Sequence, residues 1–326
     1  MPLPKKSLQI KASYLKVNDT IDVLNLKEKK FKSLGSIGDM DGYSLALRYG
    51  LSDRDSIFAS AQRWNVDYGD STLKNNKIDF FNRYLLLHKP DAFFNNLSID
   101  VGFSQDSAND IVISNDRSLN ALIKKIKPNG KYRFNDGSIV SGDTTLTLYD
   151  KQGNKIYPHI SIGDLSDRSY YARLLVGKTF SQSSILDFYV GCKYTTITTK
   201  ISFYPNNNSF VNGLIKNYKI PNMNRDEKNI NIGFSYLLQK YGFIGEFNYE
   251  YNKMLRSSDV SYLDYNHIVD ASLGRKIGEN ALIYIGGRLM MEQFNSDIPY
   301  LYNRYTKTQF DHKYGFAKIG LLYRFQ

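Results

Sequence analysis

The amino-acid sequence predicts an all-β fold: a closed antiparallel transmembrane β-barrel of twelve strands, with long extracellular loops and short periplasmic turns. Three observations predict it. Large apolar residues alternate with small or charged ones through most of the chain, long and short connections alternate between the segments, and no run of about 18 to 20 apolar residues indicates a membrane helix. The 326 residues are also 14% aromatic with only 8 prolines, a composition that favours long strands over disorder.

Period-two alternation locates the strands. In the segment 97–104, four large apolar residues alternate with two serines, one glycine and Asp100. A strand with one face against an apolar environment and the other against water has this pattern. The same pattern along the chain predicts twelve strands, at 8–16, 42–51, 56–68, 77–88, 96–105, 167–180, 184–200, 228–239, 242–254, 264–276, 281–294 and 313–325.

The connections between these segments alternate in length. Long ones such as 201–227 alternate with short ones such as 240–241. An outer-membrane barrel has this asymmetry, because its periplasmic turns are short and its extracellular loops are long. An even strand number returns both termini to the periplasmic side, and closure pairs every strand edge, as lipid requires. We therefore expect a single barrel domain over residues 1–326, with its longest extracellular loop at 106–166.

This long loop carries two local patterns of its own. From Leu119, apolar residues recur at helical spacing, which predicts a short helix over 118–126 that either plugs the barrel or caps the loop. The segments 144–149 and 155–157 form a predicted β-hairpin. If this hairpin enters the membrane, the barrel has fourteen strands, although Pro158 and the length of the hairpin make it short for a span.

Composition and motifs exclude several other classes of protein. Positive residues exceed negative ones by 43 to 32, but they are spread along the chain without a nucleic-acid-binding motif, so no nucleic-acid partner is expected. The four histidines are scattered and Cys192 is the single cysteine, so no metal site or cofactor is expected. The first residues contain no apolar signal core. We therefore expect either a mature chain with an added Met1 or a chain that is not exported.

The last residues resemble a known signature. The run Gly320–Gln326 is an alternating apolar strand whose final aromatic, Phe325, is followed by one glutamine. It resembles the C-terminal strand of the outer-membrane β-barrels of Gram-negative bacteria, and the likeness in architecture covers essentially the whole chain. The resemblance implies a location in the cell outer membrane, with outer-membrane lipid and lipopolysaccharide as partners.

Aromatic residues are expected at both lipid boundaries of such a barrel. The predicted extracellular belt contains Tyr43, Tyr170, Tyr251 and Tyr265, and the predicted periplasmic belt contains Tyr49, Tyr323 and Phe325.

A second resemblance concerns catalysis. Outer-membrane phospholipase A, another twelve-stranded barrel, carries a glycine-aromatic stretch leading into His-x-Ser, and the six residues Gly102–Ser107 are similar to it. Gln105 stands where that family has histidine, and an amide cannot take the proton of Ser107 near neutral pH. His159 and Ser161 form a His-x-Ser pair only within the long loop. We therefore assign no catalytic residue. A lipid-acting enzyme and a structural or adhesive barrel that displays its loops remain alternatives.

Charged residues on the parity opposite the apolar stripe are the main functional signal. A dry core could not hold this many charges, so they either line a water-filled pore or brace a closed barrel as ion pairs. Twelve strands give a bore between that of filled eight-stranded and open sixteen-stranded barrels. We predict a porin-like channel for small hydrophilic solutes, lined by Arg48, Asp100, Arg173, Lys193, Glu246, Glu250, Asp270, Arg288, Glu292 and Lys318.

The five cations of this set are expected near mid-height against a single carboxylate, Asp270, which predicts a weak preference for anions. The register of the last strands places Asp270 opposite Arg288 inside and Leu273 opposite Ile285 outside. Lys318 follows one strand further on. A brace of one carboxylate between two cations is therefore the expected form of a closed interior.

Overall fold

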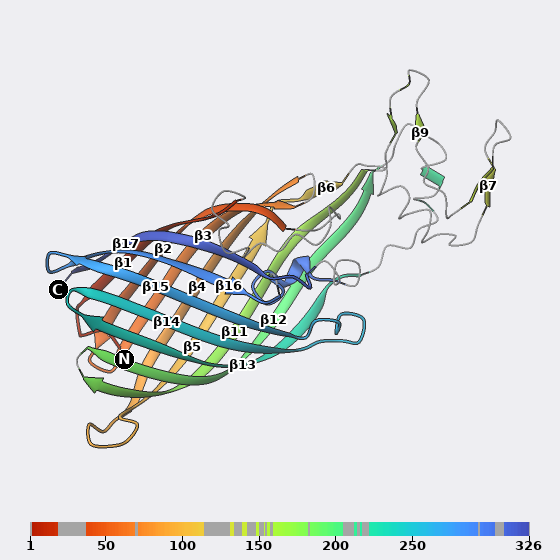
Figure 1. Ribbon diagram of the computed structural model, residues 1–326. Helices are drawn as coiled ribbons and strands as arrows, with labels where there is room; N and C mark the ends of the chain where they lie inside the picture. Colours follow the sequence, from red (N-terminus) through yellow and green to blue (C-terminus); the bar gives the residue numbers. More distant parts are fainter. Residues whose placement is uncertain are drawn as a thin grey trace. The chain divides into compact units, whose positions relative to one another are not determined.

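The computed structural model describes residues 2–18, 37–68, 71–113, 131–133, 139–141, 148–149, 153, 155–156, 159–181, 183–204, 212–213, 216, 222–292, 294–303 and 310–325. Twelve long strands form a closed antiparallel barrel (Figure 1). Their bounds are β1 Leu8–Val17, β2 Ile37–Ser52, β3 Asp55–Tyr68, β4 Ser71–His88, β5 Asn96–Ala108, β11 His159–Ser181, β12 Ser184–Tyr204, β13 Arg225–Lys240, β14 Phe243–Leu255, β15 Tyr265–Ile277, β16 Ala281–Met290 and β17 Tyr314–Phe325.

Each barrel strand pairs with its neighbours in sequence, and β1 closes the sheet by pairing with β17, where Leu8 lies opposite Phe325. Both termini therefore lie at the end of the barrel that carries the short turns (Figure 1). One of these turns joins β13 to β14 through Tyr241 and Gly242, with φ angles of 52° and 78°. A two-residue hairpin with both central residues in the left-handed region matches the twist of its strands.

The chain divides into two compact units. The barrel unit comprises Met1–Ala108, Ser166–Thr198 and Asn224–Gln326, and the second unit comprises Asn109–Leu165 and Thr199–Met223. Within the second unit, β6 (Ile111–Ile113) pairs with the first residues of β11. Two further pairs complete its described strands, β7 (Lys131–Arg133) with β8 (Ile139–Ser141) and β9 (Leu148–Tyr149) with β10 (Lys155–Ile156).

The barrel is apolar outside and polar inside. Large apolar side chains such as Ile285 (60% exposed) and Val101 (54%) lie on the outer surface, whereas Asn75, Asp100 and Asp106 are buried. This inverts the arrangement of a soluble domain, because lipid rather than water covers the outer face of a membrane barrel. In the part of the chain that the structure describes, no helix is long and apolar enough to cross a membrane.

The twelve predicted strands are confirmed, most of them with bounds within a few residues. The predicted hairpin is also confirmed as β9 and β10, and it forms a separate two-stranded sheet. The barrel therefore has twelve strands rather than the alternative fourteen. The predicted helix at 118–126 lies outside the described residues.

Five predicted boundaries are wrong by four residues or more. Three of them are strands that extend further at the long-loop end: β2 begins at Ile37 rather than at 42, β11 begins at His159 rather than at 167, and β12 ends at Tyr204 rather than at 200. β4 begins at Ser71 rather than at 77, because the ladder between β3 and β4 continues until Tyr68 lies opposite Ser71. Their connection is therefore shorter than the 89–95 connection at the opposite end, and the strict alternation of connection lengths fails there. β16 ends at Met290 rather than at 294, because the chain leaves the barrel wall and turns inward.

The residues of the predicted aromatic belts lie on the outer face; most are near a strand end, but Tyr43 and Tyr170 lie nearer the middle of the long strands β2 and β11. Tyr43 is 60% exposed and contacts Tyr14 across the sheet, with ring centroids 5.6 Å apart. Tyr323 and Phe325 contact each other at the short-turn end, with ring centroids 4.6 Å apart. Such rings suit the lipid headgroup region, where one side is apolar and the other is wet.

Candidate functional site

The interior of the barrel is the candidate site, and its central feature is an inward-folded segment between β16 and β17. We call residues 291–292 and 294–303 the inner segment; its only described helix is the 3-10 turn η1 (Pro299–Leu301). Phe294, Ile298, Tyr300 and Tyr302 in it are fully buried. Because Phe294 contacts Trp64 and Tyr300 contacts Asn75, two buried residues on the inner face of the wall, these side chains pack inside the barrel.

The inner segment contacts strands on both sides of its own attachment point. On one side, Phe294 packs against Trp64 of β3 and the Tyr300 hydroxyl donates to the side chain of Asn75 in β4. On the other side, Lys193 of β12 donates to the carbonyl of Ser296, with an Nζ–O distance of 3.4 Å. In the strand order, β3–β4 and β12–β13 lie on opposite sides of β16 and β17. The inner segment therefore crosses the interior.

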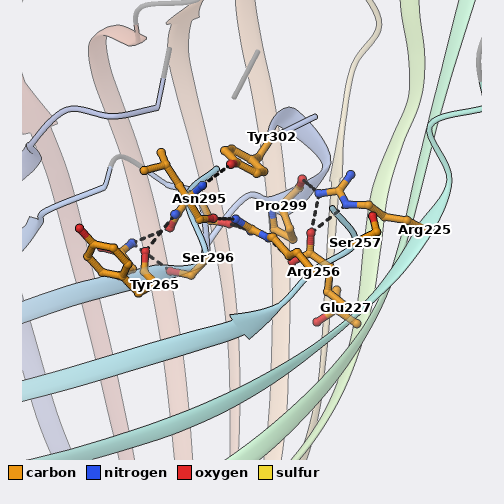
Figure 2. Close-up of polar contacts among 12 residues, drawn as sticks. Arg225, Glu227, Arg256, Ser257, Tyr265, Asn295, Ser296, Pro299 and Tyr302 are labelled. Atoms are coloured by element: carbon orange, nitrogen blue, oxygen red, sulfur yellow. Dashed lines mark hydrogen bonds and ion pairs between the residues drawn. The ribbon is translucent and has the colours of Figure 1, made fainter. Parts of the chain in front are cut away.

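Two arginines hold the inner segment by its main-chain carbonyls (Figure 2). Arg225 of β13 donates to the carbonyl of Pro299 over 2.9 Å, and Arg256 donates to the carbonyl of Asn295 over 2.6 Å. Both cations pair with Glu227, at 2.7 and 2.9 Å. The Arg256 guanidinium also lies 4.2 Å from the centroid of the Tyr302 ring. The side chain of Arg256 is fully buried and shares its one carboxylate with Arg225, so its remaining donors need carbonyls, and those of Leu263 and Asn295 accept from them.

Asn266 of β15 completes the attachment. Its side-chain amide donates to the carbonyl of Glu292 and to the side chain of Asn295, over 2.8 and 2.9 Å, and its oxygen accepts from the Glu292 amide. Burial raises the pKa of Tyr300 well above its ordinary value, and nearby Asp106 and Asp167 raise it further. Burial likewise raises the pKa of Tyr302. Both phenols are therefore neutral at physiological pH; the Tyr300 hydroxyl donates to Asn75, and the Tyr302 hydroxyl accepts from the backbone amide of Leu263.

Two acidic residues lie close enough to Tyr300 to act on it electrostatically. Asp106 of β5 and Asp167 of β11 are direct cross-strand partners, and both are buried. Asp106 pairs with Lys77 at 2.9 Å and accepts from the Asn75 amide at 3.0 Å. Within the described part of the chain, Oδ2 of Asp167 has no hydrogen-bond partner. Among the described residues, the close cation Lys77 is thus ion-paired with Asp106 rather than with Asp167.

The predicted brace in the last strands is confirmed. Asp270 lies opposite Arg288 in the register and pairs with it at 3.3 Å, and Lys318 pairs with the same carboxylate at 3.3 Å. Leu273 lies opposite Ile285, as expected for the outer face. Arg288 also reaches Asp297 of the inner segment, at 3.2 Å. The brace therefore supports the inner segment as well as the wall.

The other predicted interior residues fall into separate groups. Arg173 pairs with Glu250 at 3.4 Å, and Tyr189 donates to the same carboxylate. Asp100 accepts two hydrogen bonds from Arg83, at 2.7 and 2.8 Å. Arg48 and Glu246 lie nearer the short turns, and Glu292 belongs to the inner segment rather than to a strand. The expected single ring of cations against Asp270 is thus divided among several partners.

Sequence reasoning missed the main contributors to the long-loop end, namely Trp64, Lys77, Asp106, Arg225, Glu227 and Arg256. Parity along longer strands would have placed Lys77, Asp106, Arg225 and Glu227 inside, since β4, β5 and β13 extend past their predicted ends. No local pattern in the sequence indicates the fold of the inner segment.

A chamber occupies the interior at the short-turn end. It has a volume of about 440 Å³ and is lined by both charged and apolar side chains, among them Arg48, Arg83, Phe58, Phe81 and Leu282. Its volume lies within the range of small-molecule sites, which is roughly 300–1,000 Å³.

The serine site suggested by the second resemblance gains no base in the described residues. Ser107 lies opposite Asn76 and Ser166, and among the described residues no histidine hydrogen-bonds to it. Ser161 is buried opposite Val112, and the side chain of His159 lies outside the described part. A serine without an adjacent base is a weak nucleophile.

The fold and the apolar outer surface define the class of the protein: it is an outer-membrane β-barrel. The translocator domain of autotransporter NalP from Neisseria meningitidis has a similar fold, with a TM-score of 0.50, 9% identity and coverage of 99% of this chain and 90% of that one. A KdgM porin is also similar, with a TM-score of 0.39, 10% identity and coverage of 98% of this chain and 99% of that one. So is LpxR from Salmonella typhimurium, with a TM-score of 0.42, 9% identity and coverage of 97% of this chain and 99% of that one. At these identities the likeness concerns the fold alone. No protein-family model and no curated protein matches the chain.

Proposed function

We propose that this barrel is a channel for small hydrophilic solutes and that the inner segment controls their passage. One observation carries the proposal: the inner segment crosses the interior, yet it is attached through side chains rather than through strand pairing. A strand-paired plug could move only by breaking a ladder. The inner segment can leave by exchanging side-chain hydrogen bonds for water, while the twelve-stranded wall stays intact.

The charged wall supports the same proposal. Asp270 and Asp100 each pair with an arginine on the adjacent strand, and Glu250 of β14 pairs with Arg173 of β11, which is not an adjacent strand. Once the inner segment moves, these charged side chains would line a water-filled path along which ions can pass. A weak preference for anions is part of the proposal, because Arg288 and Lys318 share the one carboxylate of Asp270, and the other acidic partner of Arg288, Asp297, belongs to the inner segment.

Conductance in planar bilayers tests the channel. Wild-type protein is compared with a variant in which residues 294–301 are replaced by a glycine-serine linker of equal length. We expect the wild type to open intermittently and the variant to conduct continuously. The control removes the β9–β10 hairpin, which has no strand pairing to the barrel, and should leave conductance unchanged. Absence of conductance from both the wild type and the linker variant would contradict the proposal.

The alternative is a barrel that stays closed and presents its second unit at the cell surface. The observation that favours it is the size of that unit, which comprises Asn109–Leu165 and Thr199–Met223. An absence of conductance, together with a phenotype in surface adhesion on removing 114–156, would support this alternative.

A further inference from the structure

We infer that the chamber at the short-turn end binds aromatic carboxylates, that is, small anions with a planar apolar group. The inference deepens the proposed function and rests on it for its meaning, since such an anion would be a solute of the channel. The binding itself requires no conduction.

The first observation is an aromatic pair on the inner wall. Phe58 of β3 and Phe81 of β4 are direct cross-strand partners, and their rings stack with centroids 4.6 Å apart and an interplanar angle of 27°. Both line the chamber, and both remain partly exposed to it. A purely aqueous passage gains nothing from apolar rings, whereas a planar apolar ligand stacks on them favourably.

The second observation is the placement of arginines beside these rings. Arg48 of β2 is the direct cross-strand partner of Phe58. The guanidinium of Arg83 lies 5.9 Å from the centroid of the Phe81 ring. Arginine recognises a carboxylate through two parallel hydrogen bonds. A ligand that stacks on the Phe58–Phe81 pair would therefore direct a carboxylate towards Arg48.

The third observation is the charge of the chamber. Its lining contains five cations and two anions, namely Lys11, Arg48, Arg83, Lys276 and Arg324 against Glu246 and Glu279. Two further carboxylates, Asp100 and Asp187, are within electrostatic range of Arg48, which leaves one cation in excess. We assign the ligand contact to Arg48 because it is the direct cross-strand partner of Phe58.

These three observations select the ligand class. A small inorganic anion would use the positive charge but leave the rings in water. A neutral aromatic molecule would use the rings but not the excess charge. Only a ligand with both groups uses both features, and a volume of about 440 Å³ accommodates a single aromatic ring with a carboxylate.

Equilibrium binding of benzoate, measured by isothermal titration calorimetry with the barrel in detergent, tests the inference. Acetate and benzyl alcohol are the matched probes, each lacking one of the two groups, and heats from empty micelles are subtracted. We expect benzoate to bind more tightly than either. Arg48→Gln should weaken benzoate binding by about tenfold or more, as expected for loss of a charge-assisted hydrogen bond. Phe58→Leu should weaken it by several-fold while leaving acetate unchanged.

Arg275→Gln is the control, because Arg275 is exposed and does not line the chamber. Retention of the heat-modifiable gel shift shows that each variant has folded. Benzoate binding that is unchanged in both Arg48→Gln and Phe58→Leu would overturn the inference, and so would acetate binding as tight as that of benzoate. If benzoate binds but the protein shows no conductance, the binding site is supported and the proposed channel function is contradicted.

Discussion

The indole ring of Trp64 packs against the ring of Phe294, with centroids 5.9 Å apart, and so joins the barrel wall at β3 to the segment that leaves β16. Phe294 also contacts Tyr314 at the start of β17, at 4.8 Å. Trp64 is the only tryptophan of the chain, and 2% of it is exposed. Its fluorescence therefore reports whether the inner segment is in place.

Phe294→Ala should expose Trp64 to water. Removing a fully buried phenylalanine costs about 3–5 kcal/mol where the site cannot collapse, and here that cost falls on the docking of the inner segment. We expect a red-shifted emission maximum and stronger quenching by iodide. The control is Phe93→Ala, since Phe93 is 79% exposed in the connection between β4 and β5. An unchanged spectrum in Phe294→Ala would show that the inner segment does not depend on this contact.

Arg256→Gln should release the inner segment at the other side of the barrel. The variant removes the cation shared with Glu227 and leaves the carbonyl of Asn295 without its donor. Breaking a buried ion pair from one side costs about 3–5 kcal/mol. We expect more frequent opening in single-channel recordings and a lower temperature for loss of the folded gel band. Arg275→Gln, at an exposed position near the short turns, is the control and should behave as wild type.

Asp106 and Asp167 should respond in opposite ways to the same substitution. Asp167→Asn removes one of two like charges that face each other across a buried pair, and we expect a neutral effect or a stabilisation of about 1 kcal/mol. Asp106→Asn removes the close partner of Lys77 and should destabilise by about 3 kcal/mol. Chemical unfolding in detergent measures both. Equal losses of stability would mean that the two carboxylates have equivalent partners.

Asp270→Asn should increase the preference of the open channel for anions. The substitution removes the carboxylate that Arg288 and Lys318 share. Arg288 keeps Asp297 in the intact chain but not in the linker variant, which lacks residues 294–301. These side chains are partly exposed, so the loss of stability should be only about 1 kcal/mol. The reversal potential in a salt gradient, recorded on the linker variant, gives the selectivity. A shift towards cations would show that Asp270 does not face the permeating ions.

The positions and pairing of the strands were predictable from the sequence because they depend on local information. Side chains alternate with a period of two, and strands joined by short turns pair with each other, so parity and turn length together give the register. The Asp270–Arg288 and Leu273–Ile285 pairs follow from that rule alone and are both present. The charged inner face was predictable in the same way, since the residues that alternate with the outward apolar ones along each strand must face inward.

The inner segment was decided only by the tertiary structure. Its residues show no periodicity, and its partners are distant in sequence: the hydrogen bond between Tyr300 and Asn75 joins residues 225 positions apart. Nothing in a connection between two strands says whether it extends outward or folds back. The choice depends on buried groups from several strands, among them Trp64, Lys193 and Arg225, which come together only when the barrel closes. The sequence by itself thus determined a membrane barrel with a charged interior, and closure of the sheet decided what fills it, because only closure places these distant side chains around one segment.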